Sequence, residues 1–208
     1  MLQIIPALLV AITVVIQCLA VQMSRYRLSR MNARPPHHGL ALMSGMLAAA
    51  AIILRLYQND SAVGVLFMTI MTGCMTLMTL TDAASCRLPR PFTIMYLISG
   101  SAFRLWQGDW LTGLCSAGFW FLLLLLFRQY TSYRRKTETI GLGDVFLIAG
   151  IAIWSSPGDI PWIVATAAGG ALLYLWCNRQ RRITRELPFG PFLCASQYAF
   201  TFYPGGLW

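Results

Sequence analysis

The run AVGVLFMTIMTGCMTLMTLTD, residues 62–82, decides the fold class. Residues 62–81 carry no charged side chain, and the first acid of the run is Asp82. Twenty residues of helix measure about 30 Å, which matches the thickness of the hydrocarbon layer of a bilayer. The sequence therefore predicts a membrane-spanning helix over residues 62–80, with Asp82 just beyond it at the membrane surface.

Similar apolar runs recur along the whole chain. Of 208 residues, 57% are hydrophobic and 11% charged, against roughly 25% charged in an ordinary globular domain. No polar stretch is long enough to form a separate soluble domain. We therefore predict an all-α, polytopic transmembrane helical bundle of about eight spans, which forms a single membrane-embedded domain over residues 1–208. The predicted spans are residues 3–21, 39–57, 62–80, 91–106, 110–127, 140–154, 160–177 and 189–203.

The distribution of charge predicts the orientation in the membrane. The net charge is +9, and the basic residues gather in four segments, residues 25–34, 87–90, 128–136 and 179–185, which follow alternate predicted spans. The opposite loops are short and carry Asp60, Asp109 and Asp159. By the positive-inside rule, the basic loops face the cytoplasm and both termini face outward. No basic stripe with interleaved aromatics occurs, so nucleic acid is not an expected partner.

Two arginines fall outside this pattern. Arg55 and Arg104 lie near the outer ends of their predicted spans. We expect each guanidinium to extend to the membrane interface, as long basic side chains commonly do.

The cysteines and histidines predict no metal site. The six cysteines include no Cys-x-x-Cys pair, which is the spacing typical of zinc-binding knuckles. In the predicted spans they act as small apolar residues. Because Cys86 lies in a predicted cytosolic loop, we expect no disulfides. His37 and His38 are adjacent in a basic loop, where we expect them to be solvated.

Two acids on the predicted cytoplasmic side are placed by helix length. The acids on that side are Asp82, Glu138, Asp144 and Glu186. From Asp144 to the turn that ends at Gly158 there is only about 21 Å of helix, which is less than the hydrocarbon thickness. This helix should therefore begin at or near Gly141, with Asp144 at a depth similar to that of Asp82.

Two carboxylates at one depth of a small bundle can perform acid–base chemistry. If they face each other they would share a proton, because like charges at close range do not both ionise easily. One carboxylate could then take a proton from water while the other donates one to a peptide carbonyl, as in aspartic proteases. The alternative is that neither acid is catalytic. Asp82 would then be a solvated acid at a helix end, and Asp144 would be an acid in the first turn of its helix, where the helix dipole favours a negative charge.

Local sequence around both acids favours the catalytic alternative. The segment that ends at Asp144 reads Glu138-Thr-Ile-Gly141-Leu-Gly143-Asp144, and two glycines allow close approach of another backbone. Seven residues after Asp82, Pro89 breaks the chain before the fourth span. The last span opens with Leu-Pro188-Phe189-Gly190-Pro191, an irregular entry on the same predicted face.

Together, and in this order, these elements resemble the type IV prepilin peptidase (leader peptidase) family. The resemblance covers the chain from the third predicted span to its end. It implies a polytopic aspartic endopeptidase of the inner (cytoplasmic) membrane that removes short basic leaders from prepilins or pseudopilins at the cytoplasmic surface. Presenilin-like proteases share Gly-x-Gly-Asp, but they pair it with Tyr-Asp and Pro-Ala-Leu elements that this chain lacks.

The resemblance also implies roles for individual residues and partners. Asp82 and Asp144 take the catalytic positions, and Gly141 and Gly143 take those of the motif glycines. The supporting positions are Glu138, Pro89, Pro188, Phe189, Gly190 and Pro191. A prepilin or pseudopilin substrate, the lipid bilayer and a pilus or secretion assembly machinery are the implied partners, and no cofactor is implied.

Two departures from the family pattern matter. The family usually carries a lysine two residues after the second aspartate, where this chain has Phe146. A positive charge there would stabilise ionised carboxylates, so its loss is expected to change the pH optimum or weaken substrate placement. Many members also carry a cytosolic domain with two Cys-x-x-Cys pairs, associated with N-methylation, between the first two spans. Here residues 22–38 contain no cysteine, and we expect no methyltransferase activity.

Two other functions are consistent with the sequence. The chain could be a catalytically silent assembly subunit of a pilus or secretion machine, a reading that Phe146 keeps open. It could instead be a small proton-coupled transporter whose membrane carboxylates carry protons. A transporter needs polar residues along a continuous path, and the fifth and sixth predicted spans contain very few.

Overall fold

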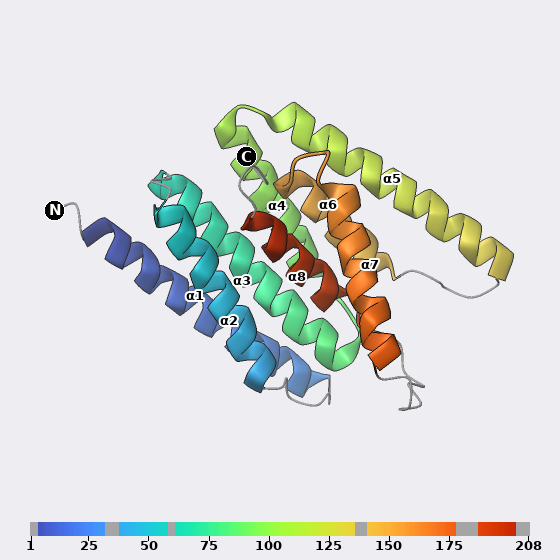
Figure 1. The fold of residues 1–208 in the computed structure, drawn as a ribbon, viewed down its shortest axis with the longest axis horizontal. Coiled ribbons are helices and arrows are strands. Elements are labelled where there is room, and N and C mark those ends of the chain that lie inside the picture. The colour runs from blue at the N-terminus through green and yellow to red at the C-terminus, as the bar shows by residue number, and fades with distance from the viewer. Residues whose placement is uncertain (1–3, 32–37, 58–60, 136–140, 178–186, 203–208) are drawn as a thin grey trace.

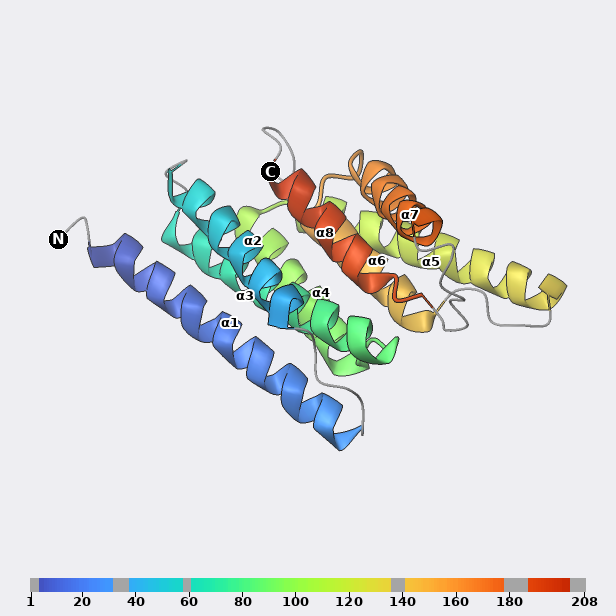
Figure 2. The same ribbon diagram turned by 60° about the horizontal axis from the view of Figure 1, so that its bottom comes forward.

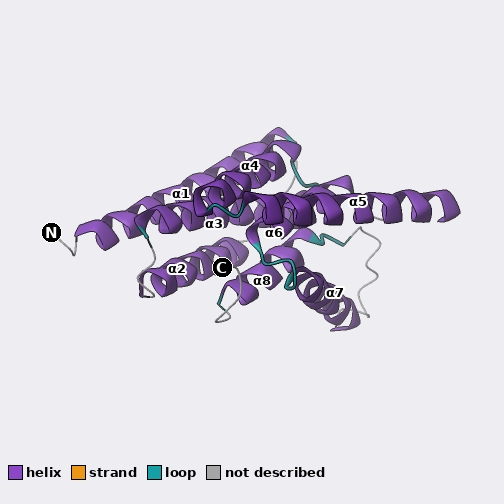
Figure 3. Ribbon diagram, turned by 90° about the horizontal axis from the view of Figure 1, so that it is seen from above, coloured by secondary structure: helices purple, strands orange, loops and turns teal. Residues whose placement is uncertain are grey.

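The computed structural model describes residues 4–31, 38–57, 61–135, 141–177 and 187–202. These residues form eight α-helices and no strand, which confirms the all-α prediction (Figures 1 and 3). In chain order the helices are α1 (Ile4–Arg30), α2 (His38–Tyr57), α3 (Ala62–Ser85), α4 (Arg90–Gln107), α5 (Trp110–Arg135), α6 (Leu142–Trp154), α7 (Ile160–Cys177) and α8 (Gly190–Thr201).

Each predicted span corresponds to one helix, but the helices differ in their capacity to cross a bilayer. Five of them, α1, α2, α3, α5 and α7, are long and apolar enough to do so. The chain is thus a multi-pass membrane protein. The other three helices are α4, α6 and α8. Of these, α6 has 13 residues and α8 has 12, or roughly 20 Å of helix each.

Three helices extend at least five residues past their predicted ends: α3, which continues from residue 80 to Ser85, and the longer cases of α1 and α5. The first predicted span ends at residue 21, whereas α1 continues to Arg30; the fifth ends at residue 127, whereas α5 continues to Arg135. Both extensions are rich in arginine, a good helix former, so the helix does not stop where the apolar run stops. The far end of α5 extends past the other helices (Figures 1 and 3).

Helix α3 lies at the centre of the bundle. It packs against α1, α2, α4 and α8, and all of residues 71–82 are buried. Figure 2 shows α1 on one side of the bundle and α5 and α7 on the other. Hydrogen bonds join α1 to α3 within the membrane-spanning region: the Thr13 and Thr69 hydroxyls lie 3.2 Å apart, and Gln17 Nε2 donates to Thr72 Oγ1 at 3.2 Å. Such bonds stabilise helix pairs in lipid, where burial of apolar surface contributes little.

Helix α6 is enclosed by its neighbours. Residues 147–154 are all buried, and α6 packs against both α4 and α5. A polar network fixes α8 beside it: the Tyr96 hydroxyl of α4 donates to Gln197 Oε1 of α8 at 2.6 Å, and Trp154 Nε1 of α6 donates to the Tyr96 carbonyl at 3.2 Å. Helices α4, α6 and α8 are therefore connected to one another by hydrogen bonds, and α8 also bonds to the middle of α3 through Tyr198 and Thr72.

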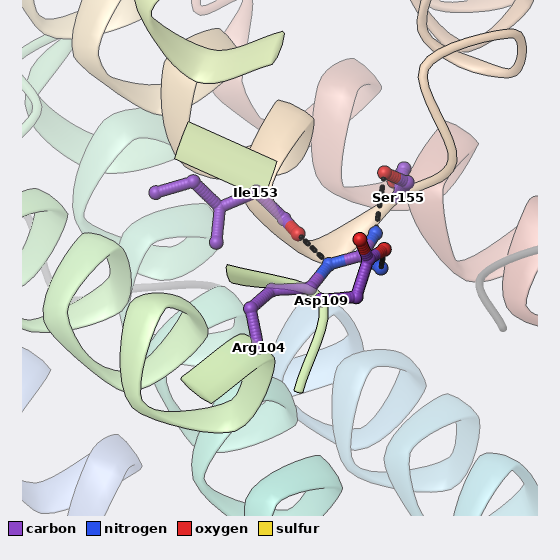
Figure 4. Close-up of polar contacts among 4 residues, drawn as sticks. All are labelled: Arg104, Asp109, Ile153 and Ser155. Atoms are coloured by element: carbon purple, nitrogen blue, oxygen red, sulfur yellow. Dashed lines mark hydrogen bonds and ion pairs between the residues drawn. The ribbon is translucent and has the colours of Figure 1, made fainter. Parts of the chain in front are cut away.

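Arg104 is buried against the end of α6. It is 6% exposed, and its guanidinium donates to the carbonyls of Ile153 at 2.8 Å and Ser155 at 2.9 Å (Figure 4). These carbonyls lie at the C-terminal end of α6, where helix carbonyls lack intrahelical partners. Asp109 Oδ2 is 3.2 Å from Arg104 Nη1. Arg55 is also buried, at 7% exposed. A buried set of carbonyls thus holds Arg104 and fixes the end of α6.

Replacing Arg104 by methionine should lower the free energy of unfolding by about 2–4 kcal/mol, because it leaves buried carbonyls without donors. Asp109→Asn is the matched control, since the Asp109 side chain is 51% exposed and its ion pair should contribute less than about 1 kcal/mol. Thermal unfolding of the purified protein in detergent micelles measures both effects. An equal loss of unfolding free energy in the two variants would contradict the conclusion that the carbonyls bound by Arg104 stabilise the fold.

Candidate active site

Asp82 lies near the end of α3 and is almost fully buried, with 4% of its surface exposed. The helix ends one turn later at Cys86, which adopts a left-handed conformation and donates its N–H to the Asp82 carbonyl at 2.7 Å. The Asp82 side chain accepts a hydrogen bond on Oδ2 from the Gly190 N–H at 2.8 Å. A buried carboxylate without a partner is costly, so this contact largely decides where the Asp82 carboxyl group lies.

The donor of that bond belongs to the first turn of α8. Phe189 is the N-cap residue, Gly190 begins the helix, and Pro191 follows in the first turn, where a missing N–H costs nothing. A β-carbon at position 190 would lie 2.8 Å from Asp82 Oδ2. Only glycine therefore allows this approach of α8 to α3, and the free N–H of the helix N-terminus favours a negative partner.

Asp144 lies in the first turn of α6. Gly141 is the N-cap, and its carbonyl accepts the Asp144 N–H at 3.1 Å. The predicted start of this helix at or near Gly141 is thus confirmed. Asp144 is partly buried, and its carboxylate interacts favourably with the positive end of its own helix.

The start of α6 is fixed against the segment between α3 and α4. A β-carbon on Gly143 would lie 2.7 Å from Leu88 Cβ, so glycine permits direct contact of the two segments. Pro89 follows Leu88 as the N-cap residue of α4, and Pro91 lies in the first turn of that helix. The break predicted at Pro89 is therefore the boundary that brings Leu88 under α6.

Asp82 and Asp144 line one pocket of about 280 Å³. Their helices do not pack directly against each other along the described residues; α4 and α8 contact both. The two carboxyl groups are nevertheless close enough to interact electrostatically. The other residues that line the pocket are Cys86, Arg87, Leu88, Arg90, Gly141, Leu142 and Gly143. Since Arg87 and Arg90 are exposed, the pocket combines two acids with two cations at its open side.

The predicted site residues divide into three groups. Asp82, Asp144, Gly141 and Gly143 line the pocket. Gly190 contacts the pocket through Asp82, whereas Pro89, Pro188, Phe189 and Pro191 bound the helices that form it. Glu138 lies outside the described residues.

Several pocket residues were not predicted from the sequence. They follow Asp82 in the chain, up to the first residue of α4, and are Cys86, Arg87, Leu88 and Arg90. Their nearness to Asp82 in sequence was the one signal that could have identified them as pocket residues. Phe146, the departure from the family lysine, does not line the pocket; its ring lies 5.2 Å from that of Phe121 in α5. Within the described ranges, no three His, Cys, Asp or Glu side chains are grouped to hold a metal ion.

Gly143→Ala should lower the free energy of unfolding by about 1–3 kcal/mol, because the added methyl collides with Leu88 and moves α6 from the α3–α4 segment. Gly118→Ala in α5 is the control, since nothing lies within 4 Å of its β-carbon position. Because alanine has the higher helix propensity, this variant should be slightly more stable than the unaltered protein. Thermal unfolding in micelles compares the variants. A Gly143→Ala protein as stable as the Gly118→Ala protein would show that the contact is not tight.

Comparison of the sequence with known proteins identifies a family to which the chain is similar. A sequence model of the type IV leader peptidase family matches residues 69–176, which include both aspartates. The "Prepilin leader peptidase/N-methyltransferase" of Burkholderia pseudomallei strain 1026b is 33% identical over 175 residues, covering 79% of this chain and 53% of that protein. The "Leader peptidase HopD" of Escherichia coli is 33% identical over 75 residues, covering 33% of this chain and 48% of that protein.

The chain spans about half the length of the curated relatives it matches. No solved structure matches it. The family match covers just over half of the chain, and it agrees with the resemblance seen in the ordered motifs. On these grounds the chain belongs to the type IV leader peptidase family.

Proposed function

We propose that the protein is a membrane aspartic endopeptidase that removes the short basic leader from type IV prepilins or pseudopilins. The observation that carries the proposal is that Asp82 of α3 and Asp144 of α6 line one pocket although their helices do not pack together. Membership of the leader peptidase family supports the same reaction.

The proposed reaction needs both carboxyl groups in different protonation states. One carboxylate takes a proton from water, and the resulting hydroxide adds to the scissile carbonyl carbon. The other carboxyl group donates its proton to the carbonyl oxygen, which gives a tetrahedral diol. When the C–N bond breaks, the amine takes a proton from the first carboxyl group and the second recovers one from the diol. Both groups thus return to their starting state, and the leader leaves with a new carboxyl terminus.

The surroundings of Asp82 support its catalytic position. The Gly190 N–H holds one carboxylate oxygen at 2.8 Å, so the carboxyl group has a fixed direction before substrate binds. Such preorganisation lowers the cost of reaching the transition state. Gly190 is a positioning residue in this proposal, and the turn at Pro188–Pro191 places it.

The proposed location is the cytoplasmic side of the inner membrane. The ends of α1 and α3 and the start of α2 carry or adjoin the arginine-rich segments, and the pocket lies at the same end. The positive-inside rule then assigns this end to the cytoplasm and both termini to the outside. The whole chain acts as one membrane-embedded peptidase unit in this proposal.

Prepilin-type substrates are proposed from the relatives' names, and a pilus or secretion assembly machinery would receive the product. The Burkholderia relative is named for N-methyltransferase as well as peptidase activity. We propose peptidase activity alone for this chain, because residues 22–38 contain no cysteine that could correspond to the Cys-x-x-Cys pairs associated with methylation.

Asp82→Asn and Asp144→Asn should each reduce leader cleavage about a thousandfold or more, because either change removes half of the acid–base pair. The measurement is the rate at which the purified protein in detergent cleaves a synthetic prepilin peptide. Asp109→Asn, at the opposite end of α4, is the control and should cleave normally. Normal cleavage by either dyad variant would refute the assignment, and absence of cleavage by the unaltered protein would favour a silent assembly subunit.

Gly190→Ala should lower kcat about 10- to 100-fold with little change in KM, because the methyl group displaces the Asp82 carboxyl from its position. The β-carbon would lie 2.8 Å from Oδ2, so the carboxyl group must move. Gly118→Ala again provides the control, with kcat unchanged. If Gly190→Ala kept full kcat, the contact with Asp82 would have no catalytic importance.

A further inference from the structure

A second pocket lies between α1 and α2, apart from the pocket with the two aspartates. Its volume is about 580 Å³. Helices α1 and α2 both pack extensively against α3 and less against each other, which leaves a groove between them. The walls are mostly apolar or small, and they include Val21 of α1 and Ala41, Leu42, Gly45 and Met46 of α2. Leu42 and Met46 are strongly exposed, so the groove opens toward the surrounding lipid.

One end of the groove is basic. Arg25 of α1 and His38 of α2 both line it, and Arg25 Nη2 lies 3.2 Å from His38 Nδ1. A guanidinium has no acceptor, so Arg25 donates and His38 Nδ1 accepts. The neutral ring then carries its proton on Nε2, and the guanidinium retains further N–H groups. Two donors from different helices therefore converge at the end of an apolar groove.

No acid of these helices compensates that charge. Residues 1–59 contain neither aspartate nor glutamate. The neighbouring arginines of α1 make other contacts: Arg30 Nη2 donates to the Tyr26 hydroxyl at 2.6 Å, and the Arg27 guanidinium lies 5.2 Å from the centre of the Phe92 ring. Arg25 is thus the arginine of α1 that faces the groove.

The basic end of the groove lies on the same side of the bundle as the aspartate pocket. The contact between Arg27 and Phe92 joins the end of α1 to the start of α4. Arg90, two residues before Phe92, lines the pocket with Asp82 and Asp144. Charge at this end therefore faces the membrane surface at which cleavage is proposed.

We propose that the α1–α2 groove binds one anionic phospholipid, with its phosphate on Arg25 and His38 and an acyl chain along the apolar wall. Basic pockets between membrane helices that sit at the membrane surface suit anionic lipid head groups. An apolar substrate helix would cover the walls but would leave the charge of Arg25 uncompensated. A phospholipid would pair its phosphate with the basic end of the groove and cover the apolar walls with an acyl chain.

The test measures lipid retained by the full-length purified protein in detergent, by native mass spectrometry, with dioleoyl phosphatidylglycerol and dioleoyl phosphatidylcholine as probes. Arg25→Gln should weaken phosphatidylglycerol binding about fivefold, as expected for one basic residue at a membrane surface. Gly45→Leu should weaken binding of the same lipid by filling the groove, since Gly45 lines it and nothing lies within 4 Å of the β-carbon position at 45.

Matched controls separate the groove from general surface charge. Arg30→Gln removes one charge from the same helix outside the groove, and Gly118→Leu adds the same side chain at an equally open position of α5. Both should bind phosphatidylglycerol within twofold of the unaltered protein, and phosphatidylcholine should bind more weakly throughout. Equal losses in Arg25→Gln and Arg30→Gln, or equal retention of the two lipids, would overturn the proposal. So would a Gly45→Leu protein that retains phosphatidylglycerol but has a raised KM for prepilin peptide, since the groove would then bind substrate.

Discussion

A carboxylate buried inside a membrane helix bundle needs a partner, and Asp82 has one in the Gly190 N–H at 2.8 Å. This single bond joins the end of α3 to the start of α8, segments that lie 108 residues apart in the chain. Because α8 also bonds to α4 through Gln197 and Tyr96, the position of Asp82 is linked to the helices that enclose α6. The geometry of the pocket depends on this contact.

The second aspartate is placed by the two ends of a short helix. At its start, α6 rests on Leu88 through Gly143; at its end, its carbonyl groups are bound by the buried Arg104 (Figure 4). A helix of 13 residues fixed at both ends has little freedom to slide or tilt. Asp144 therefore reaches the pocket from a helix whose backbone does not lie next to that of α3 within the described residues. The intervening helices α4 and α8 set the separation of the acids.

Apolar runs predicted the helices well, because a membrane span needs only length and low polarity. Length and composition single out five of the eight helices as candidate spans, and composition alone does not separate a buried helix such as α6 from a span. Counting residues predicted a similar depth for Asp82 and Asp144, and the family resemblance identified them as a pair. The sequence pattern does not reveal which helices are neighbours. Three features depend on this and were not predicted: the bond from Gly190, the contact of Leu88 with Gly143, and the carbonyls around Arg104. The burial of Arg104 was not predicted, because its acceptors lie about 50 residues away in sequence.

The most direct test of the central claim measures the nearness of positions 82 and 144 in the membrane. Cysteines at these two positions, in a variant whose six native cysteines are replaced by alanine, would be treated with a bifunctional thiol reagent no longer than one helix diameter, about 10 Å. The account predicts an intramolecular cross-link between 82 and 144 and none between cysteines at 82 and 109. Failure of the first pair to cross-link, with both thiols reactive toward a monofunctional reagent, would mean that the two acids do not share a site.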